Sequence, residues 1–185
     1  MATYLFAWNP VYWDWPELGD EIRRLKRRGH VAIGWASGRT RSIEPGSRAF
    51  MVRLGTPPKG IIGSGFTLTP PTPGRHWIDS KAKAGVPALH LKLRFEVLSA
   101  APIVSFDELA RPPFSRFRWG VRASGTRVPS TLAEALEALW EKRVAETASD
   151  APPSSCTCRT SRRRTFSAHG ICGRTKMQCR APDSA

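Results

Sequence analysis

The first 150 residues contain no cysteine, because all four cysteines of the chain lie between positions 156 and 179. A disulfide-held scaffold is therefore excluded for this part, and its fold must depend on packing. Long hydrophobic runs are missing too, since no stretch reaches the roughly 18 consecutive apolar residues of a membrane span. The N-terminal sequence MATYLFAWNP lacks the basic and apolar segments of a signal peptide. We expect a soluble, cytoplasmic protein with no membrane partner.

Signatures of catalysis are also missing. The chain has no Gly-x-Ser-x-Gly turn, and the histidines of the first 150 residues have no cysteine to pair with. Residues 60–65, GIIGSG, lack the lysine of a phosphate-binding loop, so they indicate close strand packing instead. His76 and Asp79 are too few ligands for a metal-dependent nuclease. We predict no catalytic residue, no metal site and no cofactor.

What the chain does have is positive charge. It carries 29 Lys and Arg against 15 Asp and Glu, which gives a formal net charge of +14 and a pI near 10.8. Such a protein is attracted to polyanions, most commonly nucleic acid and, second, an anionic membrane surface. The sequence ELGDEIRRLKRRG, residues 17–29, predicts a helix that ends at Gly29 and has a strongly basic face. That face either is solvated or contacts phosphates.

The composition changes near residue 150, which divides the chain into a folded domain, residues 1–148, and a tail, residues 149–185. Residues 151–185 hold seven basic residues, one acidic residue and hardly a large apolar one. Such a segment buries too little surface to offset its ordering entropy, so we predict a disordered basic tail.

Two other interpretations of the tail are open. One is a metal site, although the spacing of its ligands fits zinc poorly; they would be Cys156, Cys158, His169, Cys172 and Cys179. The other is that the tail is translated out of frame, because one shifted back-translation of residues 154–169 gives a plausible acidic linker.

In the domain, short apolar segments bounded by Gly or Pro predict strands at residues 3–8, 30–35, 48–55 and 60–69. Residues 88–98, ALHLKLRFEVL, alternate apolar and polar side chains and predict the clearest strand. Residues 102–109 add a last strand and a helical turn. Residues 111–129 have no clear period and are loop-like.

A second helix is predicted near the end of the domain. Thr131 and Glu134 form a capping-box pattern, followed by a single apolar helical face with Leu132, Leu136, Leu139, Trp140 and Val144. The strands and helices do not alternate as a parallel βαβ series would. They indicate an α+β fold, with a small mixed or antiparallel sheet of about five or six strands curled into a barrel and flanked by helices.

The tryptophans are unevenly distributed, with five of the seven inside the first 77 residues. Trp8 ends an apolar strand and Trp140 lies on the apolar helical face, so we expect both in the core. Trp35 and Trp77 each leave a strand-like run for a polar, basic stretch, and each is either core or a flat surface on which an unstacked base can lie. We expect phosphate contacts from the nearby arginines, which are Arg39, Arg41 and Arg75.

Several short motifs follow one another along the domain: WNP (8–10), WPEL (15–18), WASGRTRSIEPGSRAFMVRLG (35–55), GIIGSG (60–65) and HW (76–77). In this order they resemble the EVE domain, a member of the PUA-like superfamily. The resemblance covers residues 3 to about 145. Within the family, the sequence is similar in particular to the version found N-terminal to HNH endonucleases. It implies a PUA-like curled β-barrel with helices packed outside.

EVE domains and the related YTH and ASCH domains read modified nucleic-acid bases in a pocket with aromatic walls. The resemblance implies two tryptophans that sandwich a base flipped out of its stack, and three residues near its polar edge. The implied base-binding residues are Trp35, Trp77, Ser37, Gly38 and Asn9. Trp13 and Trp15 are substitutes for either wall.

The leading hypothesis is therefore a non-catalytic module that reads a modified base in nucleic acid, with DNA preferred and modified cytosine as the target. Related fusions continue into an HNH nuclease domain, whereas this sequence shows no nuclease motif. A second hypothesis is the specificity half of a modification-dependent HNH restriction endonuclease, truncated before its nuclease domain. A third is a protein-interaction domain whose charge is incidental.

Overall fold

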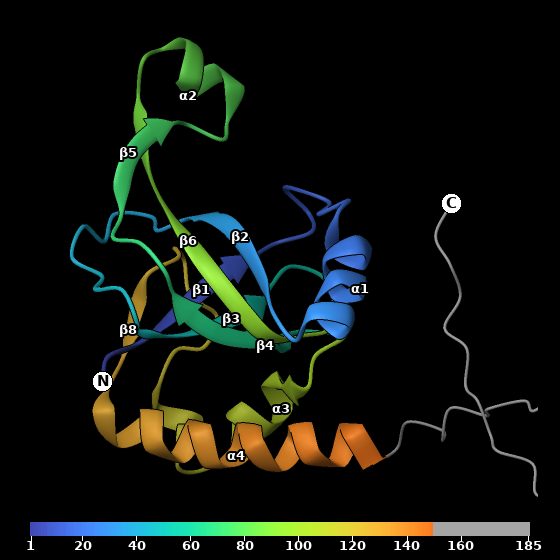
Figure 1. Ribbon diagram of the computed structural model, residues 1–185. Coiled ribbons are helices and arrows are strands. Elements are labelled where there is room, and N and C mark those ends of the chain that lie inside the picture. The colour runs from blue at the N-terminus through green and yellow to red at the C-terminus, as the bar shows by residue number, and fades with distance from the viewer. Residues whose placement is uncertain (150–185) are drawn as a thin grey trace, which may run out of the picture. The chain divides into compact units, whose positions relative to one another are not determined.

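The computed structural model describes residues 1–149, and within them one mixed sheet of eight strands is packed with helices (Figure 1). The strands are β1 (Thr3–Trp8), β2 (Val31–Ala36), β3 (Arg48–Arg53), β4 (Gly60–Thr67), β5 (Thr72–Arg75), β6 (Pro87–Leu98), β7 (Val104–Ser105) and β8 (Thr126–Val128). The helices are α1 (Leu18–Arg28), α2 (Asp79–Lys83), α3 (Phe106–Leu109), α4 (Ser130–Ser149) and the 3-10 helix η1 (Phe114–Arg116). The predicted α+β class is confirmed.

The strand order is β2-β6-β4-β3-β1-β8, with β5 added to β6 and β7 added to β4. Among residues 1–149 the outer strands β2 and β8 do not pair with each other, so the sheet is open. β1 pairs in parallel with β3 and antiparallel with β8, which places the first strand in the interior of the sheet. The six strands predicted from the sequence are all present, and β5 and β8 are additional, so the sheet has eight strands and not the expected five or six.

Strands β1 and β3 are buried at almost every position because both faces of the sheet are covered there. Tyr4, Phe6 and Trp8 of β1 belong to one core cluster, and Leu5 belongs to the other. The first cluster also holds Trp15 and Trp35. Alternation along one strand therefore supplies both cores, and Trp8 is buried as predicted.

The glycines of β4 allow it to approach β6 closely. A Cβ atom on Gly65 would lie 1.9 Å from the Arg94 carbonyl oxygen, and one on Gly63 would lie 2.8 Å from the Val97 carbonyl oxygen. The register between the strands shifts between Ser64 and Gly65. The interpretation of GIIGSG as close strand packing is confirmed.

Helix α1 ends as predicted, because Gly29 has a left-handed φ of 75° and its N–H donates to the Leu25 carbonyl. All five of its basic residues are exposed, although Arg23 forms an ion pair with Asp20 and Arg24 forms one with Glu21. Glu21 itself is buried. The basic face of this helix is open to solvent.

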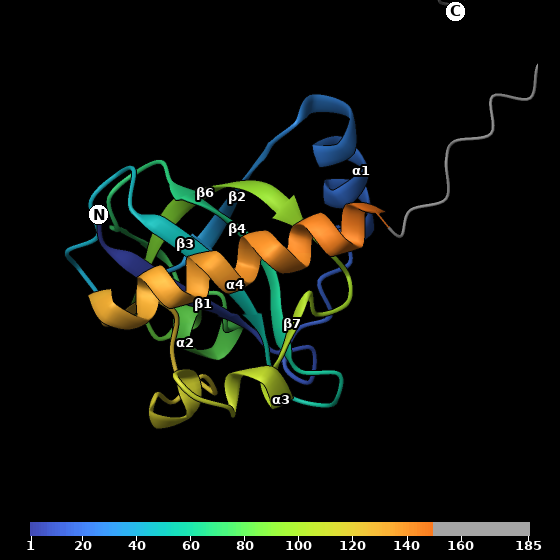
Figure 2. The same cartoon turned by 90° about the horizontal axis from the view of Figure 1, so that it is seen from below.

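Helix α4 lies across one face of the sheet, next to α3 (Figure 2). The predicted apolar face is confirmed, since Leu136 and Trp140 are buried and the other three predicted residues pack beside them. The predicted capping box is wrong. With Thr131 as the N-cap the first helical residue would be Leu132, but the helix begins two residues earlier, at Ser130, and the Pro129 carbonyl accepts hydrogen bonds from the N–H groups of Leu132 and Ala133.

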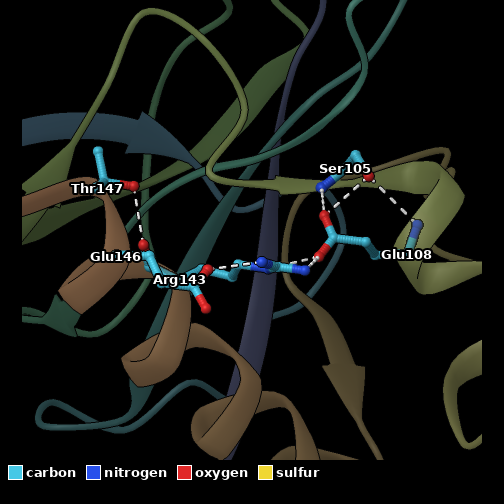
Figure 3. A network of polar contacts seen from close by, with 5 residues as sticks. All are labelled: Ser105, Glu108, Arg143, Glu146 and Thr147. Atoms are coloured by element: carbon cyan, nitrogen blue, oxygen red, sulfur yellow. Dashed lines mark hydrogen bonds and ion pairs between the residues drawn. The ribbon is translucent and has the colours of Figure 1, made fainter. Parts of the chain in front are cut away.

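A capping box does occur at the start of α3, where it joins that helix to α4 (Figure 3). The Ser105 N–H and Oγ both donate to Glu108 Oε2 at 2.9 Å, and the Glu108 N–H donates to Ser105 Oγ. Arg143 of α4 donates to the other Glu108 oxygen at 2.6 Å and also pairs with Glu146. Burial raises the pKa of the Glu108 carboxyl, but these hydrogen bonds and the Arg143 charge outweigh it and hold the pKa below its ordinary value.

Residues 111–129 were expected to be a loop, and this expectation is wrong in two places. Residues 114–116 form η1, and residues 126–128 form β8 on the edge of β1. The segment between them also contributes Trp119 and Val121 to the second core cluster. The apolar residues of this segment are not regularly spaced, because they reach the core from irregular backbone and not from a single helix or strand.

Residues 150–185 lie outside the described part of the chain. Three predictions concern these residues and stay predictions: a disordered tail, an out-of-frame translation, and a metal site at Cys156, Cys158, His169, Cys172 and Cys179. Helix α4 continues to Ser149, one residue beyond the predicted domain boundary at 148. Within residues 1–149, every helix is too short or too polar to cross a bilayer.

Candidate functional site

A cavity of about 600 Å³ opens where β1 ends and the chain turns at Asn9. We call it the tryptophan cavity. Its lining comes from six separate parts of the chain: Ala7, Trp8, Asn9, Tyr12 and Trp13; Gly34, Trp35, Ala36 and Gly38; Leu54; Trp77; His90; and Val121, Arg122, Ala123 and Ser124. No single element builds it.

The turn after β1 is held by the Asn9 side chain and backbone. Asn9 Oδ1 accepts a hydrogen bond from the Val11 N–H at 3.0 Å, and the Asn9 carbonyl accepts from the N–H groups of Tyr12 and Trp13. The Trp8 Nε1–H donates to the Trp13 carbonyl at 2.9 Å. These contacts fix an exposed loop against a buried strand, and they place Trp8, Tyr12 and Trp13 around one opening.

Four tryptophans pack against one another at this end of the sheet. Trp15 contacts Trp35 with ring centroids 4.8 Å apart, Trp8 edge-on at 5.7 Å, and Trp13 in a stacked pair at 5.8 Å and 20°. Trp13 also meets Trp35 at 5.5 Å. Trp8, Trp13 and Trp35 line the cavity, whereas Trp15 is buried behind them. Trp15 is therefore a support for the cavity and not one of its walls.

Trp35 is both core and cavity wall. It lies on β2 opposite Leu91 of β6, is only 7% exposed, and belongs to the first core cluster. The sequence left its role open between these two possibilities, and the structure places it at the boundary of both. Loss of this indole would remove core packing as well as cavity surface.

Trp77 differs in its surroundings, because it lies on an arm formed by β5, α2 and the turn between them. This arm projects away from the rest of the domain (Figure 1), and neither β5 nor α2 has a buried residue. Trp77 is 58% exposed and stacks on His76, with ring centroids 5.7 Å apart. His90 Nε2 lies 2.8 Å from the Arg75 carbonyl oxygen and ties the arm to the start of β6. The arm holds an accessible indole at the cavity.

The loop after β2 places Gly38 in the cavity lining but not Ser37. Ser37 is fully buried, and its hydroxyl donates to the Thr40 carbonyl at 3.2 Å. Gly38 has a φ of 63°, and a Cβ atom there would lie 2.6 Å from the Ser124 carbonyl oxygen. Ser37 therefore shapes the loop, while Gly38 allows it to approach Ser124.

The three predicted phosphate-binding arginines are exposed, and none lines the cavity. Arg75 is paired with Asp79 at 3.1 Å on the projecting arm. Arg39 and Arg41 follow Gly38 and have no ion pair within residues 1–149. The structure thus brings Asn9, Trp35, Gly38 and Trp77 to one cavity and leaves Ser37 and the arginines outside it.

The cavity lining includes four polar or aromatic residues that the sequence did not single out: Tyr12, His90, Arg122 and Ser124. Arg122 and Ser124 belong to the segment without a period, whose place in the fold depends on its attachment to β1. That attachment includes a hydrogen bond from the Ala7 N–H to Ser124 Oγ at 3.0 Å. A sequence signal was present only for Tyr12, which lies between the predicted turn at Asn9 and Trp13.

The charge of the lining is positive, because it contains Arg122 and no Asp or Glu. Within residues 1–149, no three His, Cys, Asp or Glu side chains are gathered closely enough to hold a metal ion. The lining offers indole surface, a few hydrogen-bonding groups and one cation. Such a site is suited to holding a flat ring, with an anionic group outside the cavity.

No family model matches the chain, and no curated protein matches it either. Among solved structures it is similar to a hypothetical protein from Leishmania major, with a TM-score of 0.54 and 12% identity over 77% of this chain and 97% of that one. A protein from Pseudomonas syringae gives a TM-score of 0.52 and 19% identity, over 75% and 99% of the two chains. A protein from Pseudomonas putida gives 0.52 and 15% over the same shares. At these identities the likeness shows the fold alone.

Proposed function

We propose that this chain is a nucleic-acid-binding module that holds one modified base in the tryptophan cavity and does no chemistry on it. The single observation that carries the proposal is the lining itself: four tryptophans, Trp8, Trp13, Trp35 and Trp77, meet in one cavity of about 600 Å³ that contains a cation and no acid. That volume is within the range of about 300–1,000 Å³ typical of small-ligand sites. The net charge of +14 would attract a polyanion to this cavity.

The proposal includes a PUA-like fold of the EVE type. It is supported by the mixed sheet with β1 in its interior, the close antiparallel pairing of β4 with β6 at Gly65, and α4 packed on one face. The tryptophan cavity lies at the end of β1, where the WNP motif ends that strand. In this fold Trp35 and Trp77 are the aromatic walls, with Trp13 as a third aromatic surface.

Two donors are available for the polar edge of the base. Asn9 Oδ1 already accepts a hydrogen bond from the Val11 N–H, which leaves the Asn9 amide N–H₂ to donate. Ser124 Oγ already accepts from the Ala7 N–H, which leaves its own hydrogen to donate. Two donors favour a base edge with two acceptors, such as the ring nitrogen and carbonyl oxygen of cytosine. In this proposal Ser124 has the role at the polar edge that the resemblance implied for Ser37.

The preference for a modified base would come from filling apolar space between the indoles. Burying one added methyl group contributes about 0.8 kcal/mol, which corresponds to about a fourfold gain in affinity. A larger preference would require a hydrogen bond as well, as with a hydroxymethyl group.

The test uses the full 185-residue chain and DNA strands that are identical except at one cytosine: unmodified, methylated or hydroxymethylated. Because the strands carry the same phosphates, contacts to the phosphate backbone cancel in the comparison. We expect tighter binding of the modified strands in a titration followed by fluorescence anisotropy. Equal affinity, with a steep dependence on salt, would contradict base reading and leave only phosphate contacts. Strand cleavage after addition of Mg²⁺ would contradict the non-catalytic assignment.

A further inference from the structure

The rim of the tryptophan cavity carries large exposed apolar and aromatic side chains. Val11, Tyr12 and Trp13 are consecutive in the chain and are 61%, 78% and 44% exposed. Tyr12 and Trp13 line the cavity, and so does the exposed Trp77 of the arm. Scattered exposed apolar residues are ordinary on a protein surface, but a patch concentrated at one opening indicates an interaction site.

Tyr12 is exposed, yet its backbone is firmly placed. Its N–H donates to the Asn9 carbonyl at 3.0 Å, and the residues on both sides of it are also hydrogen-bonded to Asn9. The tryptophans near it are packed on one another, since Trp13 stacks on Trp15. The Tyr12 ring has no aromatic partner within residues 1–149. A rigid loop thus presents a free aromatic ring at the cavity mouth, so little entropy would be lost when something flat stacks on it.

The charge of the cavity lining favours nucleic acid as the occupant. Arg122 lines the same cavity, is exposed, and forms no ion pair in the described part of the chain. No acidic residue lines the cavity. An aromatic ring and an unpaired cation at one cavity match the combination that binds single strands, in which bases stack and phosphates are neutralised.

We propose that the Tyr12 ring stacks on the base next to the one in the tryptophan cavity, and that the chain therefore prefers unpaired nucleic acid to a duplex. This inference rests on the proposed function. In a duplex, flipping one base leaves its neighbours paired and held inside the helix, so that their faces are less accessible to an aromatic ring at the cavity mouth than the faces of unpaired bases are. In a single strand, the neighbouring base is free to leave the stack together with the captured one.

The test measures binding of the full chain to short single strands that contain one modified cytosine and an abasic site in place of either neighbour. Loss of one stacked base should weaken binding by about 5- to 150-fold, since such stacking contributes roughly 1–3 kcal/mol. We expect this loss for one neighbour only. With Tyr12→Ala the abasic strand and the intact strand should bind equally well. The matching duplex should bind the wild-type protein more weakly than the single strand does.

Two further variants serve as controls. Tyr12→Phe keeps the ring face and should behave as the wild type, whereas Leu68→Ala removes an exposed apolar side chain outside the cavity lining and should change nothing. If Tyr12→Ala responds to the abasic sites as the wild type does, or if the duplex binds as tightly as the single strand, the inference is overturned. If Tyr12→Ala instead alters binding to anionic lipid vesicles and not to the strands, the patch is a membrane-contacting surface and the inference is likewise wrong.

The outcomes also separate this inference from the proposed function. A modified strand that is preferred without any effect of Tyr12 would contradict the inference alone. An effect of Tyr12 on the abasic strands, with no preference for the modified base, would contradict base reading alone.

Discussion

Trp15 lies behind Trp35, with ring centroids 4.8 Å apart and ring planes inclined by 50°. Trp35 lines the tryptophan cavity and Trp15 does not. The orientation of this cavity wall is therefore set by a core residue that no bound base would touch.

A first prediction concerns this support. Trp15→Phe leaves a gap behind Trp35. We expect it to lower the free energy of unfolding by about 1–3 kcal/mol and also to reduce the affinity for a modified base. Trp140→Phe, the same change in the other core cluster, is the matched control. It should reduce stability while leaving affinity unchanged. Urea unfolding and oligonucleotide titration measure the two effects. If the two variants lose equal affinity, Trp15 has no specific supporting role.

Trp77 offers a clean test of the cavity because it is mostly exposed. Trp77→Ala should leave the free energy of unfolding within about 0.5 kcal/mol of the wild type and weaken binding of the modified base by about 5-fold or more. Trp35→Ala should instead cost about 3–5 kcal/mol of stability, since the side chain is buried. Thermal unfolding distinguishes the two. A Trp77→Ala protein that unfolds early would show that the arm is part of the core.

The salt dependence of binding tests Arg122. Each phosphate contact that is removed should lower the slope of log affinity against log salt concentration by about 0.7–0.9. We expect this change for Arg122→Gln. Lys142→Gln, on the exposed side of α4, is the control and should leave the slope unaltered. A slope that is unchanged in Arg122→Gln would show that this arginine contacts no phosphate.

The attachment of α4 to the sheet depends on a buried arginine. Arg48 of β3 donates to both Glu137 oxygens, at 2.9 and 2.5 Å, and to the Gly65 carbonyl at 3.2 Å. Glu137→Gln leaves the guanidinium buried without a counter-charge, so we expect a loss of about 1–3 kcal/mol in the free energy of unfolding. Glu134→Gln, exposed on the same helix, should be neutral. Equal stabilities of the two variants by urea unfolding would refute the role of the pair.

Acidification tests the junction of α3 and α4. Because the pKa of Glu108 is lower in the folded state than its ordinary value, its contribution to stability is fully present above that ordinary value. The contribution is lost as the pH falls through the lowered folded-state pKa. Between about pH 6 and about pH 3, the free energy of unfolding of Glu108→Gln should therefore fall less steeply with decreasing pH than that of the wild type. Asp107→Asn, at the exposed neighbouring position, should keep the wild-type slope. Parallel slopes for Glu108→Gln and the wild type would contradict this account.

Much of the fold was predictable because consecutive residues show the alternation of a strand or the apolar spacing of a helix. Residues 88–98 alternate, and Leu91, Leu93 and Phe95 are buried in β6 as expected. Strand β8 was missed because three residues cannot show a period, and its pairing with β1 depends on a distant segment. The start of α4 was misplaced because Pro129 supplies the first acceptor, so Thr131 lies inside the first turn.

The candidate site was predictable only where motifs lie next to strand ends. Trp35 and Trp77 do line one cavity, with Asn9 and Gly38 beside them, while their role in binding stays a prediction. Arg122 could not be found in this way, since a segment without a period gives no indication of which residues it brings to the cavity.

The position of β1 in the interior of the sheet affects when the domain can fold during synthesis. The ribosome releases this strand first, yet Ser124, whose hydroxyl holds the Ala7 N–H, is translated 117 positions later. A nascent chain that stops before residue 124 has an incomplete cavity and a β1 whose β8 edge is unpaired. The complete tryptophan cavity can therefore form only after residue 124 has been translated, near the end of the domain. On the proposed function, base binding by nascent chains of increasing length would report when the domain folds.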